Sequence, residues 1–339
     1  MTDNRTWDGI GLGSLDDLLA RHGLAGVPEE PFPNDGWSGA SMTLLRRGAE
    51  RFVLKRDSLA RDWIARSTRD GPIPREAWFA VHGPALPGPL RAPYLGAGLD
   101  GDDVGILMPD LSATLFDWDA PIARDALERV HSALAALHGT NRDALLPDGP
   151  WCPLPERLTL ICRASLERPG PARDAVGERI LPGWDAFDRL APAPVRRLVA
   201  DLGGDPTPLV EALRRQPSTL IHGDLKLANV GLAADGSVDL VDWQMVSVAP
   251  AAVELGWFLV ANVASLPLPP DAVLARYESL AGSIGADGAD AAVLVGLLLR
   301  GWRKGSDAEA GERFPSGVAA FDDLAWWCDR ALAAADRIL

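Results

Sequence analysis

The chain has 339 residues, a formal net charge of −14 and a pI near 4.8. Hydrophobic residues make up 47% and charged residues 24%, which predicts a large buried core and excludes a disordered protein. The length fits two domains or one large bilobal unit. The negative charge argues against nucleic-acid binding and against an anionic membrane surface, because both need clustered Lys and Arg.

The cysteines and the apolar stretches predict where the chain works. Cys152, Cys162 and Cys328 are scattered and form no CxxC pair, which suits a reducing compartment. Residues 1–8 lack the basic and then apolar order of a signal peptide. The longest apolar stretches are too short, or carry a charge and prolines, and so do not predict a membrane span. We expect a cytoplasmic protein.

The first predicted element is a short amphipathic helix over 14–22, which Ser14 caps. Two strand-like runs, 41–45 and 51–55, predict a hairpin with Gly48 at its turn. Helical patterns follow over two further segments, and an apolar strand comes next. These three elements are predicted at 57–68, 74–82 and 104–108.

The remainder of the chain is predicted to be mainly helical. Helix 119–139 has the clearest apolar periodicity, and the Pro- and Arg-rich segment 143–216 suggests short helices with loops. Short strands are expected at 219–222 and 237–242 as a small central hairpin. From residue 251 the spacing is helical, with loops expected at 266–271, 283–288 and 304–316.

This order of elements predicts an α+β fold of two lobes. The smaller N-terminal lobe, residues 1–108, would hold an antiparallel sheet and a helix, with helix 14–22 leading into it. The larger lobe, residues 109–339, would be mainly helical, and the boundary is expected near Pro109–Leu111.

Polar side chains cluster in segment 220–230, directly after an apolar strand. The segment has the pattern His-x-Asp-x-x-x-x-Asn at His222, Asp224 and Asn229, and Asp242 ends the next strand. Taken singly, each residue equally fits a structural role, such as a buried polar pair or a turn cap. Together they have the spacing of a kinase catalytic loop and metal-binding aspartate. Carboxylate and amide oxygens also suit Mg²⁺, which phosphoryl transfer from ATP requires.

On these residues the chain resembles the aminoglycoside phosphotransferase-like family, which consists of small-molecule kinases and includes choline-kinase-like relatives. The resemblance extends roughly over residues 30–330. It implies a bilobal protein-kinase-like fold with ATP in the cleft between the lobes. It also implies that Asp224 is the catalytic base, that Asn229 and Asp242 hold Mg²⁺, and that His222 is an architectural residue.

A kinase needs a phosphate-binding turn ahead of its first hairpin. The turn Gly36-Trp37-Ser38-Gly39-Ala40-Ser41 lies there and could direct backbone N–H groups at phosphates. Ser38, Gly39 and Ser41 are therefore candidate nucleotide-binding residues. A plain loop is the alternative, because turns of glycine and serine are common.

A lysine and a carboxylate should follow this turn. Only three of the 33 basic residues are lysines, and one of them, Lys55, lies on the second hairpin strand. We expect Lys55 to contact the phosphates and Glu76 to orient it; the alternatives are a solvated edge lysine and a glutamate that only favours its helix N-terminus. Segment 106–110 resembles the hinge of the family, which implies that the backbone of Leu107 and Met108 binds adenine.

Two departures from the family pattern bear on the reaction. Lys226 lies two residues after Asp224, where many relatives have histidine, and it could stabilise the transferred phosphoryl group. Trp243-Gln244 follows Asp242 where protein kinases have Phe-Gly, and no activation segment ends in Ala-Pro-Glu. A protein substrate is therefore disfavoured.

The predicted reaction transfers the γ-phosphoryl group of Mg-ATP to a hydroxyl of a small molecule, either aminoglycoside-like, an amino alcohol or a sugar. Acidic residues in the C-terminal region favour a cationic acceptor, although flanking basic residues leave a neutral sugar open. Three tryptophans could line the acceptor pocket. The alternative function is a catalytically silent nucleotide-binding sensor or scaffold. The acidic residues are Glu254, Asp307, Glu309 and Glu312, and the tryptophans are Trp118, Trp257 and Trp302.

Overall fold

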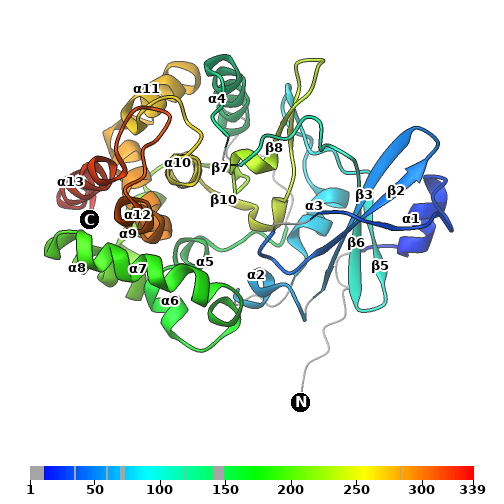
Figure 1. Ribbon diagram of the computed structural model, residues 1–339, viewed down its shortest axis with the longest axis horizontal. Coiled ribbons are helices and arrows are strands. Elements are labelled where there is room, and N and C mark those ends of the chain that lie inside the picture. Colours follow the sequence, from blue (N-terminus) through cyan, green and yellow to red (C-terminus); the bar gives the residue numbers. More distant parts are fainter. Residues whose placement is uncertain are drawn as a thin grey trace.

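An antiparallel sheet in the order β1-β2-β3-β6-β5 forms the core of the N-terminal part of the computed structural model (Figure 1). Its strands are β1 (Glu30–Pro31), β2 (Ser41–Arg47), β3 (Glu50–Ser58), β5 (Gly96–Asp100) and β6 (Asp103–Pro109). The structure describes residues 11–33, 36–58, 60–68, 73–118, 120–139, 149–282 and 284–339.

Helices cover the two faces of this sheet. Alternate side chains of a strand point to opposite faces, so Leu54 packs under α1 (Leu15–Arg21) while Val53 packs against α3 (Arg75–His82). Lys55 has the same parity as Val53 and therefore points to the α3 face. The fold thus directs the strand lysine toward the helix that carries Glu76.

Helices make up most of the chain after residue 120, on the left in Figure 1. α10 and α12 lie at the centre of this part, and α7 and α13 pack against α12. The helices are α4 (Arg124–Gly139), α5 (Leu154–Thr159), α6 (Arg163–Glu167), α7 (Glu178–Leu190), α8 (Ala193–Gly204), α9 (Thr207–Arg214), α10 (Ala251–Ala261), α11 (Pro270–Ala281), α12 (Gly285–Ala310) and α13 (Ala320–Ile338). No helix in the described part of the chain is long and apolar enough to cross a bilayer.

Short strands connect the two parts. β7 (Ser218–Ile221) pairs with β10 (Ser247–Pro250), and β8 (Val230–Leu232) forms a hairpin with β9 (Val238–Leu240). β4 (Leu90–Arg91), which lies between α3 and β5 in the sequence, pairs in parallel with β9. The Arg91 Nε donates to Asp239 Oδ1 at 2.7 Å, so this strand fastens the N-terminal part to the β8–β9 hairpin.

Most predicted elements are present in the structure. The predicted helices at 14–22 and 74–82, the first hairpin and the strand at 104–108 are confirmed. The first hairpin turns at Gly48, whose φ of 61° is favourable for glycine. The strands expected at 219–222 and 237–242 are present but do not form a hairpin with each other: the first pairs with β10 and the second with β8. The helix expected over 119–139 begins only at Arg124, and Asp119 lies outside the described residues.

Three boundary predictions are wrong. β3 continues through Ser58, so only the short α2 (Trp63–Arg66) is helical in the predicted helix 57–68. α12 begins at Gly285 and runs to Ala310, through two of the expected loops. The charged residues near 304 suggested a loop, but Lys304 is buried and forms an ion pair with Asp323 of α13 at 2.7 Å. A paired charge inside the protein gives the same sequence signal as a solvated one.

Candidate active site

The loop that follows β7 carries the catalytic pattern and has a fixed shape. His222 Nδ1 accepts the Asp224 backbone N–H at 3.2 Å, and its Nε2 lies 2.9 Å from the Val241 carbonyl and donates to it. His222 therefore ties the loop to the residue before Asp242. Gly223 has a φ of +84°, and a Cβ there would lie 2.0 Å from the Met245 carbonyl oxygen. Only glycine fits at this position.

Buried polar side chains from α5, α10 and the residue after α10 hold the backbone of this loop. The Glu254 carboxylate accepts the backbone N–H groups of His222 at 2.6 Å and Gly223 at 3.0 Å. The Arg157 Nε donates to the Gly223 carbonyl at 2.7 Å, and the Asn262 Oδ1 accepts the Leu227 N–H at 2.7 Å. Sequence reasoning assigned no loop-holding role to these residues. The available signal was a single carboxylate inside the otherwise apolar helix α10.

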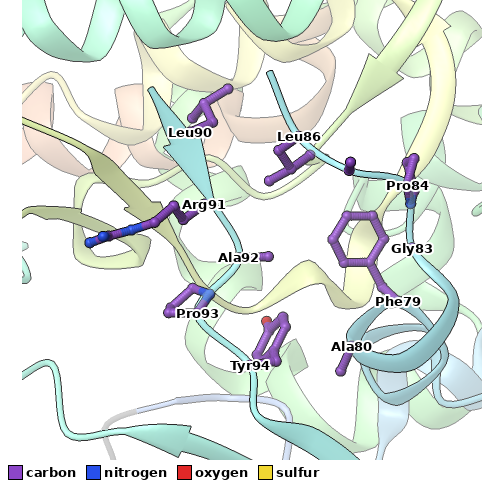
Figure 2. Close-up of a pocket in the computed structure, with 11 residues that line it drawn as sticks. Phe79, Ala80, Gly83, Pro84, Leu86, Leu90, Arg91, Ala92, Pro93 and Tyr94 are labelled. Carbon is purple, nitrogen blue, oxygen red and sulfur yellow. The ribbon is translucent and has the colours of Figure 1, made fainter. Parts of the chain in front are cut away.

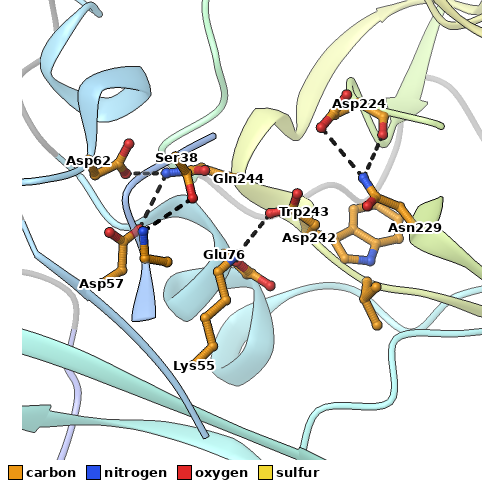
Figure 3. A network of polar contacts seen from close by, with 12 residues as sticks. Ser38, Lys55, Asp57, Asp62, Glu76, Asp224, Asn229, Asp242, Trp243 and Gln244 are labelled. Atoms are coloured by element: carbon orange, nitrogen blue, oxygen red, sulfur yellow. Dashed lines mark hydrogen bonds and ion pairs between the residues drawn. The ribbon is translucent and has the colours of Figure 1, made fainter. Parts of the chain in front are cut away.

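Asp224 has two potential side-chain partners in this loop, Asn229 and Lys226. The Asn229 Nδ2 donates to the Asp224 carbonyl at 2.8 Å and lies 3.4 Å from its Oδ2. Lys226 Nζ is 3.1 Å from the same Oδ2. Figure 3 shows Asn229 pointing toward Asp224. The structure thus brings together Asp224, Lys226 and Asn229, and the Asn229 Oδ1 stays available as an oxygen ligand.

Lys55 joins the two parts of the molecule. Its Nζ is 2.5 Å from Glu76 Oε2 on α3 and 2.8 Å from Asp242 Oδ1 after β9 (Figure 3). Burial opposes the charged ammonium, but attraction by Asp242 and Glu76 dominates and raises the pKa of Lys55. Burial likewise opposes the charged Asp242, yet Lys55 and Lys226 hold the pKa of Asp242 below its ordinary value. Both partners are therefore charged at neutral pH.

Tyr94 completes this network and was not predicted. Its hydroxyl donates to Glu76 Oε1 at 2.8 Å and accepts the Asp242 backbone N–H at 3.0 Å. Asp242 has a φ of 67° and a ψ of 54°, the left-handed region that Asp and Asn tolerate better than most residues. Tyr94 thus fixes both the carboxylate that orients Lys55 and the unusual backbone of Asp242.

The turn 36–41 reaches across to the helical part of the chain. Gly39 has a φ of +91°, and a Cβ there would lie 2.8 Å from the Arg61 carbonyl oxygen, so the turn requires glycine. The Trp37 ring lies 6.5 Å from the Trp302 ring of α12, and Arg179 of α7 lies over Trp37 at 5.2 Å. Ser38 is partly buried in this turn, and Ser41 is exposed at the start of β2.

The predicted adenine-binding residues differ in their surroundings. The Met108 side chain packs in the cluster on the α3 face of the sheet. The Leu107 side chain packs in the cluster on the opposite face, under α1, and its carbonyl accepts the Leu95 N–H at 2.8 Å. Met108 is paired in turn with Val53 of β3, so both backbones take part in the sheet, and adenine binding by Leu107 and Met108 stays a prediction.

Comparisons with known proteins now add to this geometry. The model of the phosphotransferase enzyme family, APH, matches residues 32–292. The chain belongs to this family. No match was found among the curated proteins.

Solved structures of the same fold include the choline kinase LicA from Streptococcus pneumoniae. It is 12% identical, with a TM-score of 0.50 and coverage of 94% of this chain and 98% of that one. A spectinomycin phosphotransferase in complex with ADP and spectinomycin is 14% identical, with a TM-score of 0.49 and coverage of 95% and 97%. The likeness to the choline kinase confirms the bilobal protein-kinase-like fold that the sequence predicted.

In this member of the family, three of the four C-terminal carboxylates that favoured a cationic acceptor are buried or paired with arginine. Glu254 is fully buried under the catalytic loop. Asp307 pairs with Arg303 at 2.7 Å, and Glu309 pairs with Arg189 at 2.6 Å. Glu254, Asp307 and Glu309 therefore give little support to a cationic acceptor.

A pocket between α3 and the segment that leads to β5 adjoins the candidate site of the phosphotransferase. It has a volume of about 360 Å³, and its lining includes Phe79, Leu86, Leu90 and Tyr94 (Figure 2). Tyr94 belongs to both regions, because its ring lines the pocket while its hydroxyl contacts Glu76.

An acidic cluster, formed by Asp57, Asp62 and Gln244, lies beside Ser38 of the turn 36–41 (Figure 3). The Gln244 Nε2 donates to both carboxyl groups and is 3.4 Å from Asp57 Oδ2. Burial, and then repulsion by Asp62, raises the pKa of Asp57 from 3.8 to about 8. The folded protein therefore keeps a proton on this cluster that the unfolded chain releases.

This retained proton predicts a pH-dependent stability. At pH values between 3.8 and about 8, Asp57 is deprotonated in the unfolded chain and protonated in the folded protein. The free energy of unfolding therefore falls as the pH rises through this range. We expect Asp57→Asn to flatten the dependence of Tm on pH between 5 and 9 in thermal unfolding. Asp201→Asn, an exposed aspartate on α8, is the control. Equal slopes for wild type and Asp57→Asn would contradict the prediction.

Proposed function

We propose that this protein transfers the γ-phosphoryl group of ATP to a hydroxyl of a small molecule and acts in the cytoplasm. The observation that carries the proposal is the ion-pair chain Glu76–Lys55–Asp242, which links α3, β3 and the segment after β9. His222 connects this chain to the loop that holds Asp224. A nucleotide-anchoring cation, a metal-binding carboxylate and a base are thus arranged around one junction. This intact arrangement favours an enzyme over a silent sensor or scaffold.

Asp242 and Asn229 are the residues that would hold Mg²⁺. Their remaining oxygens are hard donors of the type that Mg²⁺ prefers. The described residues contain no group of three or more His, Cys, Asp or Glu able to hold a metal ion. Phosphate oxygens and water would therefore complete the coordination. When bound, Mg²⁺ would neutralise charge on the phosphates.

The chain's own side chains account for the movement of the proton and the phosphoryl group. Asp224 accepts the proton of the acceptor hydroxyl as that oxygen forms a bond to the γ-phosphorus. The bond between the γ-phosphorus and the β–γ bridging oxygen breaks, and ADP leaves with the electron pair. Lys226, 3.1 Å from Asp224, offers positive charge to the transferred group. Asp224 later gives the proton to solvent.

The two lobes divide the substrates between them. We assign nucleotide binding to residues 1–108, with the backbone of the turn at Ser38, Gly39 and Ser41 facing the phosphates and the backbone of Leu107 and Met108 facing adenine. Residues 109–339 would carry the catalytic loop and the acceptor. The sequence argument and membership of the family support an acceptor that is aminoglycoside-like, an amino alcohol or a sugar.

Acceptor-dependent turnover of ATP tests the proposal. ADP release is measured with Mg-ATP and a panel of hydroxyl compounds, and the products are identified by mass spectrometry. We expect ADP release that depends on an acceptor and equals the phosphorylated product in amount. Nucleotide binding without any transfer would favour the sensor or scaffold instead.

Asp242→Asn is expected to raise the Mg²⁺ concentration needed for half-maximal activity more than Asn229→Ala does. A carboxylate contributes a full negative charge to a hard dication, whereas an amide contributes only a dipole. Titration of Mg²⁺ against activity in both variants measures the two shifts. Equal shifts, or no shift, would count against the assignment of Asp242 as the main ligand.

A further inference from the structure

Arg300 interrupts the longest helix of the fold close to the catalytic loop. Its φ of −138° and ψ of 25° break the helical geometry of α12. The guanidinium lies over the rings of Trp257 and Trp302, at 5.1 Å from each centroid. Arg157 lies over the same Trp257 at 4.6 Å. Two arginines and two tryptophans therefore form one stacked group, here called the Arg300 group.

The Arg300 group offers hydrogen-bond donors that have no acceptor. Arg300 Nε, Trp257 Nε1 and Trp302 Nε1 are buried without a hydrogen-bond partner among the described residues. The neighbouring cations differ: Arg303 pairs with Asp307, and Arg157 donates to the Gly223 carbonyl. No ion pair joins Arg300 to a carboxylate in the described part of the chain. A buried unsatisfied donor is costly, so a ligand that supplies acceptors would stabilise this arrangement.

Several cations gather on one side of Asp224. Arg157 and Arg300 both interact electrostatically with Asp224, and Arg300 also repels Lys226. The cations here are Arg157, Lys226, Arg300, Arg303 and Lys304, and the carboxylates that face them are Asp224, Asp242, Asp307, Asp323 and Glu254. Asp242 is already paired with Lys55, and Asp323 with Lys304. The Glu254 carboxylate already accepts two backbone N–H groups. Asp307 is paired with Arg303 through Oδ1, and its Oδ2 has no hydrogen-bond partner among the described residues.

Arg300 remains a cation under working conditions. Burial, and then repulsion by Arg303, lowers the pKa of Arg300 to about 10, while Asp224 and Asp307 oppose the shift. At neutral pH the guanidinium is therefore charged but poorly compensated.

We propose that the acceptor carries an anionic group, a carboxylate or a phosphate, which Arg300 binds while the acceptor hydroxyl meets Asp224. This inference rests on the proposed transfer of a phosphoryl group to a small-molecule hydroxyl, and it replaces the amine-bearing acceptors considered there by an anionic class. A guanidinium fixed over two indole rings presents its donors in a set orientation, which suits the paired oxygens of such an anion. A cationic acceptor would meet like charge and donors that it cannot satisfy, so the structure favours a hydroxy acid or sugar phosphate over an amine.

Matched acceptors test the charge preference directly. Gluconate, glucose and glucosamine share a six-carbon polyol skeleton but carry a carboxylate, no charge and an ammonium group, respectively. Glycerate and glycerol form a second set, with and without a carboxylate. Glucose 6-phosphate shows whether a phosphate is preferred to a carboxylate. We expect kcat/KM for the wild-type protein to be highest for an anionic member of a set. Preference for glucose, glucosamine or glycerol would overturn the inference and leave the phosphotransferase assignment standing.

Variants of Arg300 test the residue. Loss of a charge-assisted hydrogen bond predicts an increase of about 10- to 100-fold in KM for the anionic acceptor in Arg300→Gln. We expect the KM for ATP to stay unchanged, and Arg300→Lys to restore part of the acceptor affinity. Arg303→Gln is the matched control, because it removes a neighbouring cation that already has a partner. An equal effect of Arg303→Gln, or none in Arg300→Gln, would overturn the role of Arg300.

A binding measurement separates this inference from the proposed function. Malonate, a small dicarboxylate, is titrated calorimetrically into protein saturated with Mg²⁺ and a non-hydrolysable ATP analogue. We expect malonate to bind the wild type and Arg303→Gln. Arg300→Gln should bind malonate weakly or not at all, and thermal unfolding checks that this variant is folded. Absence of binding to the wild type, or equal binding to Arg300→Gln, would overturn the inference. Failure of the proposed function is recognised separately, as absence of ATP turnover with every acceptor.

Discussion

Asp224→Ala should reduce phosphoryl transfer by about 10²- to 10⁴-fold, the usual cost of removing a general base. The structure explains why the loss should be confined to this step. Asp224 makes its contacts with Lys226 and Asn229 inside the loop, whereas Lys55 is held by Glu76 and Asp242. Nucleotide affinity therefore depends on other residues and should persist.

Two measurements on the same protein check this separation. ADP release gives the rate, and calorimetric titration with a non-hydrolysable ATP analogue gives the affinity. Asp201→Ala on the surface of α8 serves as the control for removal of a carboxylate. Near-wild-type turnover in Asp224→Ala would mean that another group takes the proton. Loss of nucleotide affinity would mean that Asp224 acts on the nucleotide rather than on the acceptor.

Lys55→Arg should reduce the ATP-dependent rate by about 10²-fold or more, which is the scale for a misplaced electrostatic donor. The Lys55 side chain is only 4% exposed, and its ammonium fits between two carboxylates at 2.5 and 2.8 Å. A guanidinium is larger and planar, so it would displace Glu76 or Asp242. The substitution keeps the positive charge and should still reduce the ATP-dependent rate.

Arg56→Lys provides the reverse exchange at the next residue of the same strand. Arg56 lies on β3, the central strand of the sheet, and binds Glu29 and Asp100 rather than Glu76 and Asp242. Steady-state kinetics with varied ATP should show little change in Arg56→Lys and a large fall in kcat/KM in Lys55→Arg. Wild-type kinetics in Lys55→Arg would show that Lys55 has no part in ATP use.

Sequence reasoning was strongest where residues lie close together in the chain or contrast with the composition. The pattern from His222 to Asn229 brings its members together in one loop, as predicted. Lys55 was noticeable because lysine is rare in this chain. Strand alternation and the helix at 75–82 then place Lys55 against Glu76. Local periodicity was therefore enough for the core of the candidate site.

The residues that sequence reasoning missed either make contacts with residues far away in the chain or are of a type that is common in this sequence. Tyr94 reaches Asp242 from 148 residues away, and nothing in its own segment indicates that partner. Arg157 and Arg300 belong to a chain in which arginine is the ordinary basic residue, so neither attracted attention. Their significance comes from burial and from the absence of a carboxylate partner for Arg300 among the described residues, and a sequence shows neither property.

The scarcity of lysine has a practical consequence for chemical labelling. The Lys304 side chain has no exposed surface and Lys55 has 4%, whereas Lys226 has 37%. An amine-selective reagent added to the folded protein therefore meets one accessible lysine, 3.1 Å from Asp224. Burial opposes its charge, but Asp224 and Asp242 raise the pKa of Lys226, so alkaline conditions would favour the reaction. Among the lysines, such a reagent would thus label the loop of Asp224 without any engineered cysteine, and the α-amino group of the chain would be the other amine to react.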